Sequence, residues 1–153
     1  SIIRIMLLQI ERDLGGLGLL PPCSTYHRFA VGMTGDKMSS SKPESTIFMD
    51  DEIESMERKV KRAISGGQPT VEEHRRLGGD VSKDVAYQYL QFFFESDDAA
   101  LAEVKSEYES GRMLAGDVQQ ICIDRATDWL IDLKQKRDQM EDAVAEFLAP
   151  DAI

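Results

Sequence analysis

Apolar side chains recur every three to four residues along most of this 153-residue chain, the spacing that places them on one face of a helix. Residues 1–14 form the first such segment, which a Gly-Gly pair ends. Residues 17–23 close with two prolines and predict a connection. Residues 24–33 are rich in β-branched and aromatic side chains with a period of two, which predicts a short strand.

After residue 49 the spacing is helical almost throughout. Asp50 or Asp51 is positioned to cap a helix that runs to the Gly66-Gly67 pair, and Thr70 followed by Glu73 has the spacing of a capping box. Further helical segments are predicted over residues 71–77, 84–95, 97–110 and 115–148. With five or six helices and one strand, we expect a mainly α protein, a helical bundle attached to a remnant of α/β structure.

The apolar residues expected to face the interior are spread over these helices. They are Ile53, Met56, Val60 and Ile64, then Val85, Tyr89, Phe92 and Phe93, and finally Val118, Ile121, Ile123, Trp129, Leu130, Leu133, Met140, Val144 and Phe147.

Composition narrows the function classes. No run approaches the 18 or more apolar residues of a membrane span, and no signal peptide is recognisable, so we expect a cytoplasmic protein without a membrane partner. Cys23 and Cys122 are far apart and outside any CxxC cluster, and His27 and His74 are equally isolated. We therefore expect no metal held by protein ligands and treat the cysteines as small buried hydrophobes.

The chain carries 28 acidic and 18 basic residues, a net charge of -10. Such a balance argues against a polyanionic partner. The acids are spread along the chain rather than gathered in a tail, which favours a salt-rich cytoplasm where charge repulsion is screened. An acidic protein from an ordinary cytoplasm is the alternative.

Residues 37–45 form a serine-rich stretch without apolar periodicity, which predicts an exposed, mobile loop. The loop begins with Lys37, Met38, Ser39, Ser40 and Ser41. A lysine supplies a point charge, while hydroxyls and backbone amides donate hydrogen bonds, so the loop suits a phosphate chain. A serine-rich surface linker is the alternative interpretation.

The Lys37–Ser41 run resembles the KMSKS motif of class I aminoacyl-tRNA synthetases, with Ser40 in place of the second lysine. Downstream, residues 65–79 (SGGQPTVEEHRRLGG) resemble the SGG-x2-T-x-EEHR-x2-GG segment of archaeal and eukaryotic tryptophanyl-tRNA synthetases. Residues 108–116 are similar to the YxSGxMLxG region of the same family. The resemblance extends from about residue 24 to residue 150.

This resemblance implies an enzyme that activates tryptophan with ATP, accompanied by Mg²⁺, and transfers it to tRNA(Trp). It implies that residues 1–48 are the end of a Rossmann catalytic domain and residues 49–153 a helical anticodon-binding-like domain. ATP binding and adenylate formation map onto Lys37, Met38, Ser39, Ser40 and Ser41, with Lys37 as the catalytic cation and Lys42 as its possible substitute. The family's HIGH-like motif and most of its tryptophan pocket lie upstream of this loop, so we expect the isolated chain to be inactive.

The resemblance also implies a homodimer and a tRNA interface on the helices. Basic candidates for that interface are Arg75, Arg76, Arg112, Lys134, Lys136 and Arg137. The EEHRR segment has two interpretations, a capped structural helix or a contact to RNA or another domain. Alternatives for the whole chain are a helical RNA-binding or regulatory module derived from a synthetase, a tyrosyl-tRNA synthetase, and a generic acidic helical domain.

Overall fold

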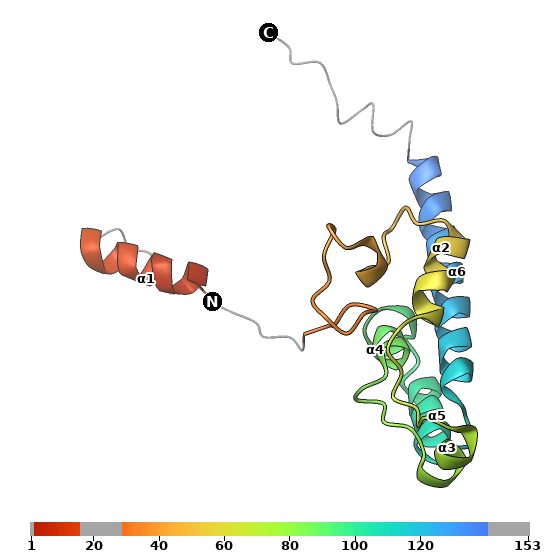
Figure 1. The fold of residues 1–153 in the computed structure, drawn as a ribbon. Coiled ribbons are helices and arrows are strands. Elements are labelled where there is room, and N and C mark those ends of the chain that lie inside the picture. Colours follow the sequence, from red (N-terminus) through yellow and green to blue (C-terminus); the bar gives the residue numbers. More distant parts are fainter. Residues whose placement is uncertain (1, 16–28, 141–153) are drawn as a thin grey trace.

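The computed structural model describes residues 2–15 and 29–140, and this part of the chain is helical and contains no strand (Figure 1). Its elements are α1 (Ile2–Leu14), a 3-10 turn η1 (Pro43–Ser45), α2 (Ile53–Lys61), α3 (Val71–Leu77), α4 (Val85–Tyr89), a π-helical turn η2 (Leu90–Phe94), α5 (Asp98–Glu109) and α6 (Ala115–Gln139). None of the described helices combines the length and apolar character needed to cross a membrane.

The long helix α6 is the element on which the others pack. It contacts α2, α4, η2 and α5, and Figure 1 shows α2 running alongside it. Its buried side chains are Val118, Cys122, Ile123, Ala126 and Leu130, each at most 2% exposed. Because burial of one such aliphatic side chain is worth about 1.5–3 kcal/mol, this stripe holds the bundle together. The prediction that Cys122 is buried is confirmed, whereas Cys23 and His27 lie outside the described residues.

The start of α2 differs from the prediction. Neither Asp50 nor Asp51 caps it; the N-cap is Glu52, which makes no side-chain cap hydrogen bond. The Asp51 carboxyl group instead accepts from the Phe48 amide at 2.8 Å and from the Lys59 ammonium. Met56 and Val60 are buried as expected, but Ile64 follows the helix end and is 47% exposed. The competing partners of Asp51 explain why it does not cap.

The predicted helix over residues 84–95 is two elements. After α4 the chain continues into η2, a π-helical turn, in which the backbone hydrogen bonds span five residues instead of the four of an α-helix. The register of the aromatic run shifts accordingly: Phe94 packs on the core and lies 5.9 Å from the Trp129 ring, while Phe93 is 51% exposed. Sequence spacing alone placed Phe93 inward.

The predicted strand is not formed where it can be checked. Residues 24–28 lie outside the described residues, and residues 29–33 have no strand partner. The Gly32 amide donates to the Asp36 carbonyl at 2.7 Å and the Met33 amide to the Ser45 carbonyl at 3.0 Å. Because these backbone groups form hydrogen bonds within a local loop, they do not pair with a neighbouring strand.

A buried carboxyl group, Asp84, joins the segments around α3, α4 and α5. Asp84 is fully buried and accepts from the Gly66 amide at 3.0 Å, the Tyr87 amide at 3.0 Å and the Tyr108 hydroxyl at 2.8 Å. We call these four residues the Asp84 hub. Burial first, and the neighbouring Asp84 second, raise the pKa of Tyr108, so its hydroxyl remains a donor.

We predict that Asp84→Ala destabilises the protein by about 3 kcal/mol or more, because three buried donors lose their acceptor at once. Asp97→Ala is the matched control, since Asp97 also caps a helix with its side chain but is exposed. Its loss should be about 1 kcal/mol. Urea unfolding at neutral pH measures both, and equal losses would contradict the role of the hub.

Alkaline pH should destabilise the fold from about pH 9 upward. Burial raises the pKa of the Cys122 thiol to about 12 and that of the Tyr89 hydroxyl to about 12, from 9.0 and 10.0. The unfolded chain therefore ionises first, so the stabilisation is complete below pH 9 and is lost as the pH rises toward 12, by about 1 kcal/mol per pH unit for each group. In urea unfolding across this range, Cys122→Ala should flatten the loss between pH 9 and 10, and an unchanged slope would contradict the assignment.

Candidate functional site

The Lys37–Ser41 run lies between a turn at residues 32–36 and the 3-10 turn η1. Lys37, Ser40 and Ser41 are exposed, whereas Ser39 is half-buried and Met38 packs against the core. The Ser39 and Ser41 hydroxyl oxygens lie 2.8 Å apart, and the Lys42 amide donates to the Ser39 carbonyl at 3.0 Å. The loop thus presents one ammonium group and a cluster of hydroxyls to solvent.

The interior of the loop is less free than an exposed, mobile segment would be. Ser45, at the end of η1, is only 1% exposed. Its hydroxyl donates to the Lys42 carbonyl at 2.7 Å and accepts from the Ser39 amide at 3.2 Å. The predicted exposure is therefore confirmed for Lys37, Ser40 and Ser41, but a buried hydroxyl ties the backbone beneath them.

A buried lysine fixes the segment that follows the loop. Lys59 on α2 has a side chain only 2% exposed, and its ammonium lies 2.6 Å from an Asp51 carboxyl oxygen and 2.9 Å from the Thr46 carbonyl. The same ammonium stands 4.8 Å from the centre of the Phe48 ring. Because a buried charge is tolerated only with such partners, residues 46–51 are held against α2.

On its other side the loop meets the aromatic residues of α4 and η2. The Tyr89 hydroxyl lies 3.4 Å from the Met38 sulfur. A cavity of about 330 Å³ opens beside this contact. It is lined by Met38, Ile47, Phe48, Met49, Tyr89, Phe92, Phe93, Phe94 and Trp129. Tyr89 was expected only as a core residue, and nothing in its spacing indicated that it touches the loop.

Positive charge left without an ionic partner is concentrated near the loop. Within residues 29–140, the basic side chains with no hydrogen-bond or ion-pair partner are Lys37, Lys42, Arg62 and Arg76. Arg62 ends α2, and two residues later the Ile64 amide donates to the Met33 carbonyl at 3.1 Å. Three of the four unpaired cations therefore belong to the loop or to a segment hydrogen-bonded to its approach.

Most of the basic candidates for RNA contact already form ion pairs or hydrogen bonds within the protein. Arg112 pairs with Glu107 at 2.6 Å, and Arg75 donates to the Gly111 carbonyl at 2.9 Å. The remaining pairs are Lys134 with Glu52, Lys136 with Asp132 and Arg137 with Asp138. Of the six candidates only Arg76 has no partner in the part of the chain that the structure describes. These surface pairs are weak, since exposed ion pairs contribute about 0–1 kcal/mol.

The EEHRR segment has a structural role in this fold. Half of the predicted capping box forms: Thr70 is the N-cap of α3 and its hydroxyl accepts from the Glu73 amide at 3.2 Å, without a return bond to the Glu73 side chain in the described structure. His74 is 3% exposed, and its Nε2 lies 2.9 Å from the Met113 carbonyl. The flanking glycine Gly78 has φ of +74°, and a Cβ there would lie 1.8 Å from the Glu109 carbonyl oxygen. The segment thus docks α3 on the turn after α5.

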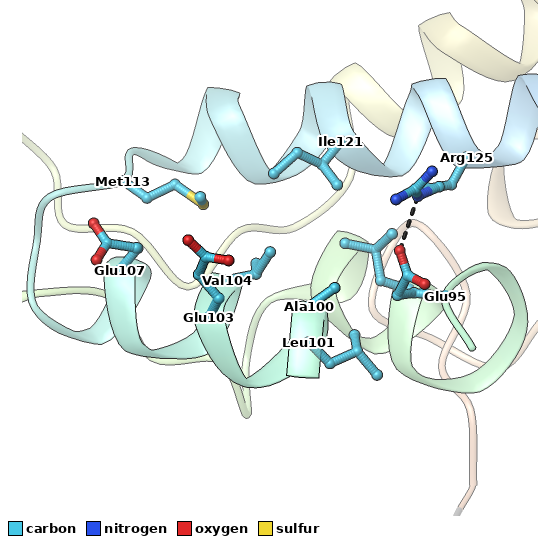
Figure 2. Close-up of a pocket in the computed structure, with 10 residues that line it drawn as sticks. Glu95, Ala100, Leu101, Glu103, Val104, Glu107, Met113, Ile121 and Arg125 are labelled. Atoms are coloured by element: carbon cyan, nitrogen blue, oxygen red, sulfur yellow. Dashed lines mark hydrogen bonds and ion pairs between the residues drawn. The ribbon is translucent and has the colours of Figure 1, made fainter. Parts of the chain in front are cut away.

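A second cavity, of about 290 Å³, lies between α5 and α6 and is drawn in Figure 2. Glu103 and Glu107 project toward it from α5, and Glu95 pairs with Arg125 at 2.8 Å at its other end. None of the predicted phosphate-binding residues reaches it. Among the described residues no group of three or more His, Cys, Asp or Glu side chains could hold a metal ion.

Comparison with known proteins places this geometry in a family. Residues 5–128 match the family model of tRNA synthetases class I (W and Y). The tryptophan–tRNA ligase of Saccharolobus solfataricus is 40% identical over 143 residues, which are 91% of this chain and 38% of that protein. The tryptophan–tRNA ligase of Methanocaldococcus jannaschii is 39% identical over 145 residues, 92% of this chain and 39% of that protein.

A solved structure of the same family has a similar fold. The crystal structure of tryptophanyl-tRNA synthetase from Aeropyrum pernix K1 superposes with a TM-score of 0.87 at 30% identity, covering 99% of this chain and 41% of that one. The chain therefore spans about two fifths of the length of these relatives. The match to the family model extends over most of the sequence and includes both the loop and the Asp84 hub. The chain belongs to the class I tRNA synthetases of the tryptophan and tyrosine group.

Proposed function

We propose that the full-length protein is a tryptophan–tRNA ligase and that this chain supplies its ATP loop and a tRNA-binding helical domain. The observation that carries the proposal is the Lys37–Ser41 loop, held in a fold that superposes on a tryptophanyl-tRNA synthetase. In the first step the tryptophan carboxylate attacks the α-phosphorus of ATP, the bond to the β-phosphate oxygen breaks, and pyrophosphate leaves. In the second step a terminal ribose hydroxyl of tRNA attacks the tryptophanyl carbonyl and AMP leaves.

In this proposal the loop acts by positioning and charge. The Lys37 ammonium neutralises charge that develops on the departing pyrophosphate, and the hydroxyls of Ser39, Ser40 and Ser41 donate to phosphate oxygens. Met38 is the packing residue of the loop, which agrees with its place against the core. Lys42, also without an ionic partner in the described residues, can supply a second charge. Mg²⁺ is assigned to the ATP phosphates, with no protein ligand.

We further propose that residues 1–48 end a Rossmann catalytic domain and residues 49–153 form the helical domain. The α1 helix supports this division, because apolar side chains along it are uncovered: Ile5 is 67%, Met6 57% and Leu14 69% exposed. Exposed apolar surface of this kind marks a contact with another part of a protein. About three fifths of the length of the Saccharolobus solfataricus relative lies outside the matched region, and this additional chain can supply that contact.

For tRNA, Arg76 is the favoured contact among the six basic candidates, because it alone has no partner to give up within the described residues. Arg75, Arg112, Lys134, Lys136 and Arg137 remain candidates, since surface ion pairs exchange readily for phosphate. A homodimer and a cytoplasmic location, where aminoacylated tRNA is used, complete the proposal.

Two alternatives are distinguishable. A non-catalytic helical RNA-binding module would lack a HIGH-like motif in the same open reading frame upstream, whereas a synthetase would have it. A tyrosyl-tRNA synthetase is also a member of the matched family, but the relatives reported above are tryptophan–tRNA ligases. The substrate amino acid is tested by exchange assays with tryptophan and tyrosine side by side.

A purified protein of these 153 residues should not catalyse tryptophan-dependent ATP–pyrophosphate exchange. The proposal assigns the tryptophan pocket and the HIGH-like motif to sequence upstream, so the loop would have no reacting groups to align. The full-length protein is the positive control in the same assay. Exchange above background by the 153-residue protein would contradict the assignment of the tryptophan pocket and the HIGH-like motif to upstream sequence.

In the full-length protein, Lys37→Ala should slow adenylate formation by raising its activation free energy by about 2–4 kcal/mol, the range for loss of one charge-stabilising donor. Affinity for tRNA should be nearly intact, because the helices that would bind it are unchanged. Single-turnover adenylate formation and filter binding measure the two quantities. Lys61→Ala is the matched control, since Lys61 is an exposed lysine paired with Glu57 on α2. An unchanged activation rate in Lys37→Ala would refute the loop assignment.

A further inference from the structure

We propose that two side chains outside the Lys37–Ser41 run, Ser45 and Tyr89, are positioning residues of the ATP loop. Ser45 fixes the loop backbone from within, and Tyr89 fixes the side chain of Met38 from the helical part of the chain. The inference rests on the proposed function, because it presumes that the loop binds ATP. It goes further by assigning the geometry of the loop to residues that its motif does not contain.

The Ser45 hydroxyl is used as a bridge across the loop. A hydroxyl offers one donor and two acceptor positions. Here it donates to the Lys42 carbonyl at 2.7 Å and accepts from the Ser39 amide at 3.2 Å. These two backbone groups flank the exposed pair of serines. The hydroxyl therefore ties both sides of the pair together, in addition to the backbone bonds from the Lys42 amide to the Ser39 carbonyl at 3.0 Å and from the Ser45 amide to the Lys42 carbonyl at 2.9 Å.

The backbone of Ser45 also ties the end of the loop to its beginning. Its carbonyl accepts from the Met33 amide at 3.0 Å. Gly32 lies so close that a Cβ on it would be 2.5 Å from the Ser45 carbonyl oxygen. Entry and exit of the loop therefore meet at Ser45, which is 1% exposed and cannot exchange these partners for water.

Tyr89 makes the second anchor, from α4. It is 3% exposed, and its ring packs edge-on against Phe93 with 5.4 Å between the ring centres. Its hydroxyl donates to the Met38 sulfur at 3.4 Å. Because burial raises the pKa of this hydroxyl to about 12, it keeps its proton at neutral pH. Hydrogen bonds to thioether sulfur are weak, so this contact positions the Met38 side chain but adds little to the free energy of unfolding.

The two anchors leave the Lys37 side chain free while fixing its surroundings. The residue after Lys37 is held through its side chain by Tyr89, and the serines are held through their backbone by Ser45. A shift of about 1 Å at groups that align a reaction can cost about a hundredfold in rate. Loss of either anchor should therefore slow the ATP-dependent step more than it weakens the fold.

The test uses the full-length protein and tryptophan-dependent ATP–pyrophosphate exchange. Tyr89→Phe removes one hydroxyl and keeps the ring, and Ser45→Ala removes the bridge. For each we expect kcat to fall about tenfold, with a higher KM for ATP and a KM for tryptophan within about twofold of the parent value, because the proposed function assigns the loop to the nucleotide and not to tryptophan. If Ser45→Ala does not fold, Tyr89→Phe still decides the question.

Two control variants match the chemistry without touching the loop. Tyr87→Phe removes a hydroxyl from the same helix, where it lies 3.5 Å from the Leu101 carbonyl. Ser110→Ala removes a hydroxyl that, like that of Ser45, donates to the carbonyl three residues earlier, at 2.9 Å from Glu107. Both should keep kcat and both KM values near those of the parent, and thermal unfolding of all four variants checks that the comparison is made on folded protein.

The outcomes separate this inference from the proposed function. If Lys37→Ala slows activation while Tyr89→Phe and Ser45→Ala do not, the loop binds ATP but these residues do not position it. If Tyr89→Phe and Ser45→Ala change kcat no more than their controls do, or raise the KM for tryptophan as much as that for ATP, their role is only structural and the inference is overturned. If Lys37→Ala itself has no effect, the assignment of the loop to ATP fails, and this inference fails with it; if the parent protein shows no tryptophan-dependent exchange, the proposed function fails.

Discussion

The fold depends on a carboxyl group that has no contact with water. Asp84 collects hydrogen bonds from the segment before α3, from the first turn of α4 and from the end of α5. These segments are otherwise short: α3 has seven residues and α4 has five, too few to be stable helices by themselves. A single acceptor shared by three donors supplies the tertiary constraint that such short helices need.

The hub explains what the SGG and GG positions do. Gly66 donates its amide to Asp84 and accepts from the Asp80 amide at 2.9 Å, and the Gly79 amide donates to the Tyr108 carbonyl at 2.9 Å. A Cβ on Gly66 would lie 2.0 Å from the Asp80 carbonyl oxygen, and one on Gly79 would lie 2.4 Å from the Tyr108 ring, so neither position has room for a side chain. Residues 65–79, the segment that resembles tryptophanyl-tRNA synthetases most specifically, therefore have a packing role in the described structure. The proposed ATP loop is a different segment, and the hub anchors the start of α4, the helix that carries Tyr89.

Sequence patterns predicted elements well where local rules act alone and less well where tertiary partners compete. The cap at Thr70 followed from side-chain chemistry. Val118, Ile123 and Leu130 of α6 are buried as predicted, whereas Trp129 is 38% and Met140 53% exposed. The cap of α2 did not follow from the sequence, because Asp51 prefers the buried ammonium of Lys59, a partner that cannot be seen in local sequence. The π-helical turn was missed for a similar reason, since its register is set by packing against α6.

The same limit applies to the candidate site. The motif identified the charged and hydroxyl groups that a phosphate needs, because those groups lie in one short run. It could not identify Tyr89, which is 51 residues away in sequence from Met38, and it gave no reason to single out Ser45 from the other serines. Burial alone separates Ser45 from the serines at positions 40 and 41. The functional geometry therefore required the three-dimensional structure.

Net charge constrains any binding site for a polyanion. A protein with a net charge of -10 would repel ATP and tRNA at long range. Within residues 29–140 most basic side chains are paired, and three of the four unpaired ones belong to the loop or to the C-terminal end of α2. At ionic strengths of about 0.1–0.15 M, charges farther apart than about 8–10 Å are largely screened, whereas cations close to a bound phosphate still act on it. An acidic surface is therefore compatible with the proposed polyanionic substrates, provided that the cations are concentrated at the proposed ATP loop.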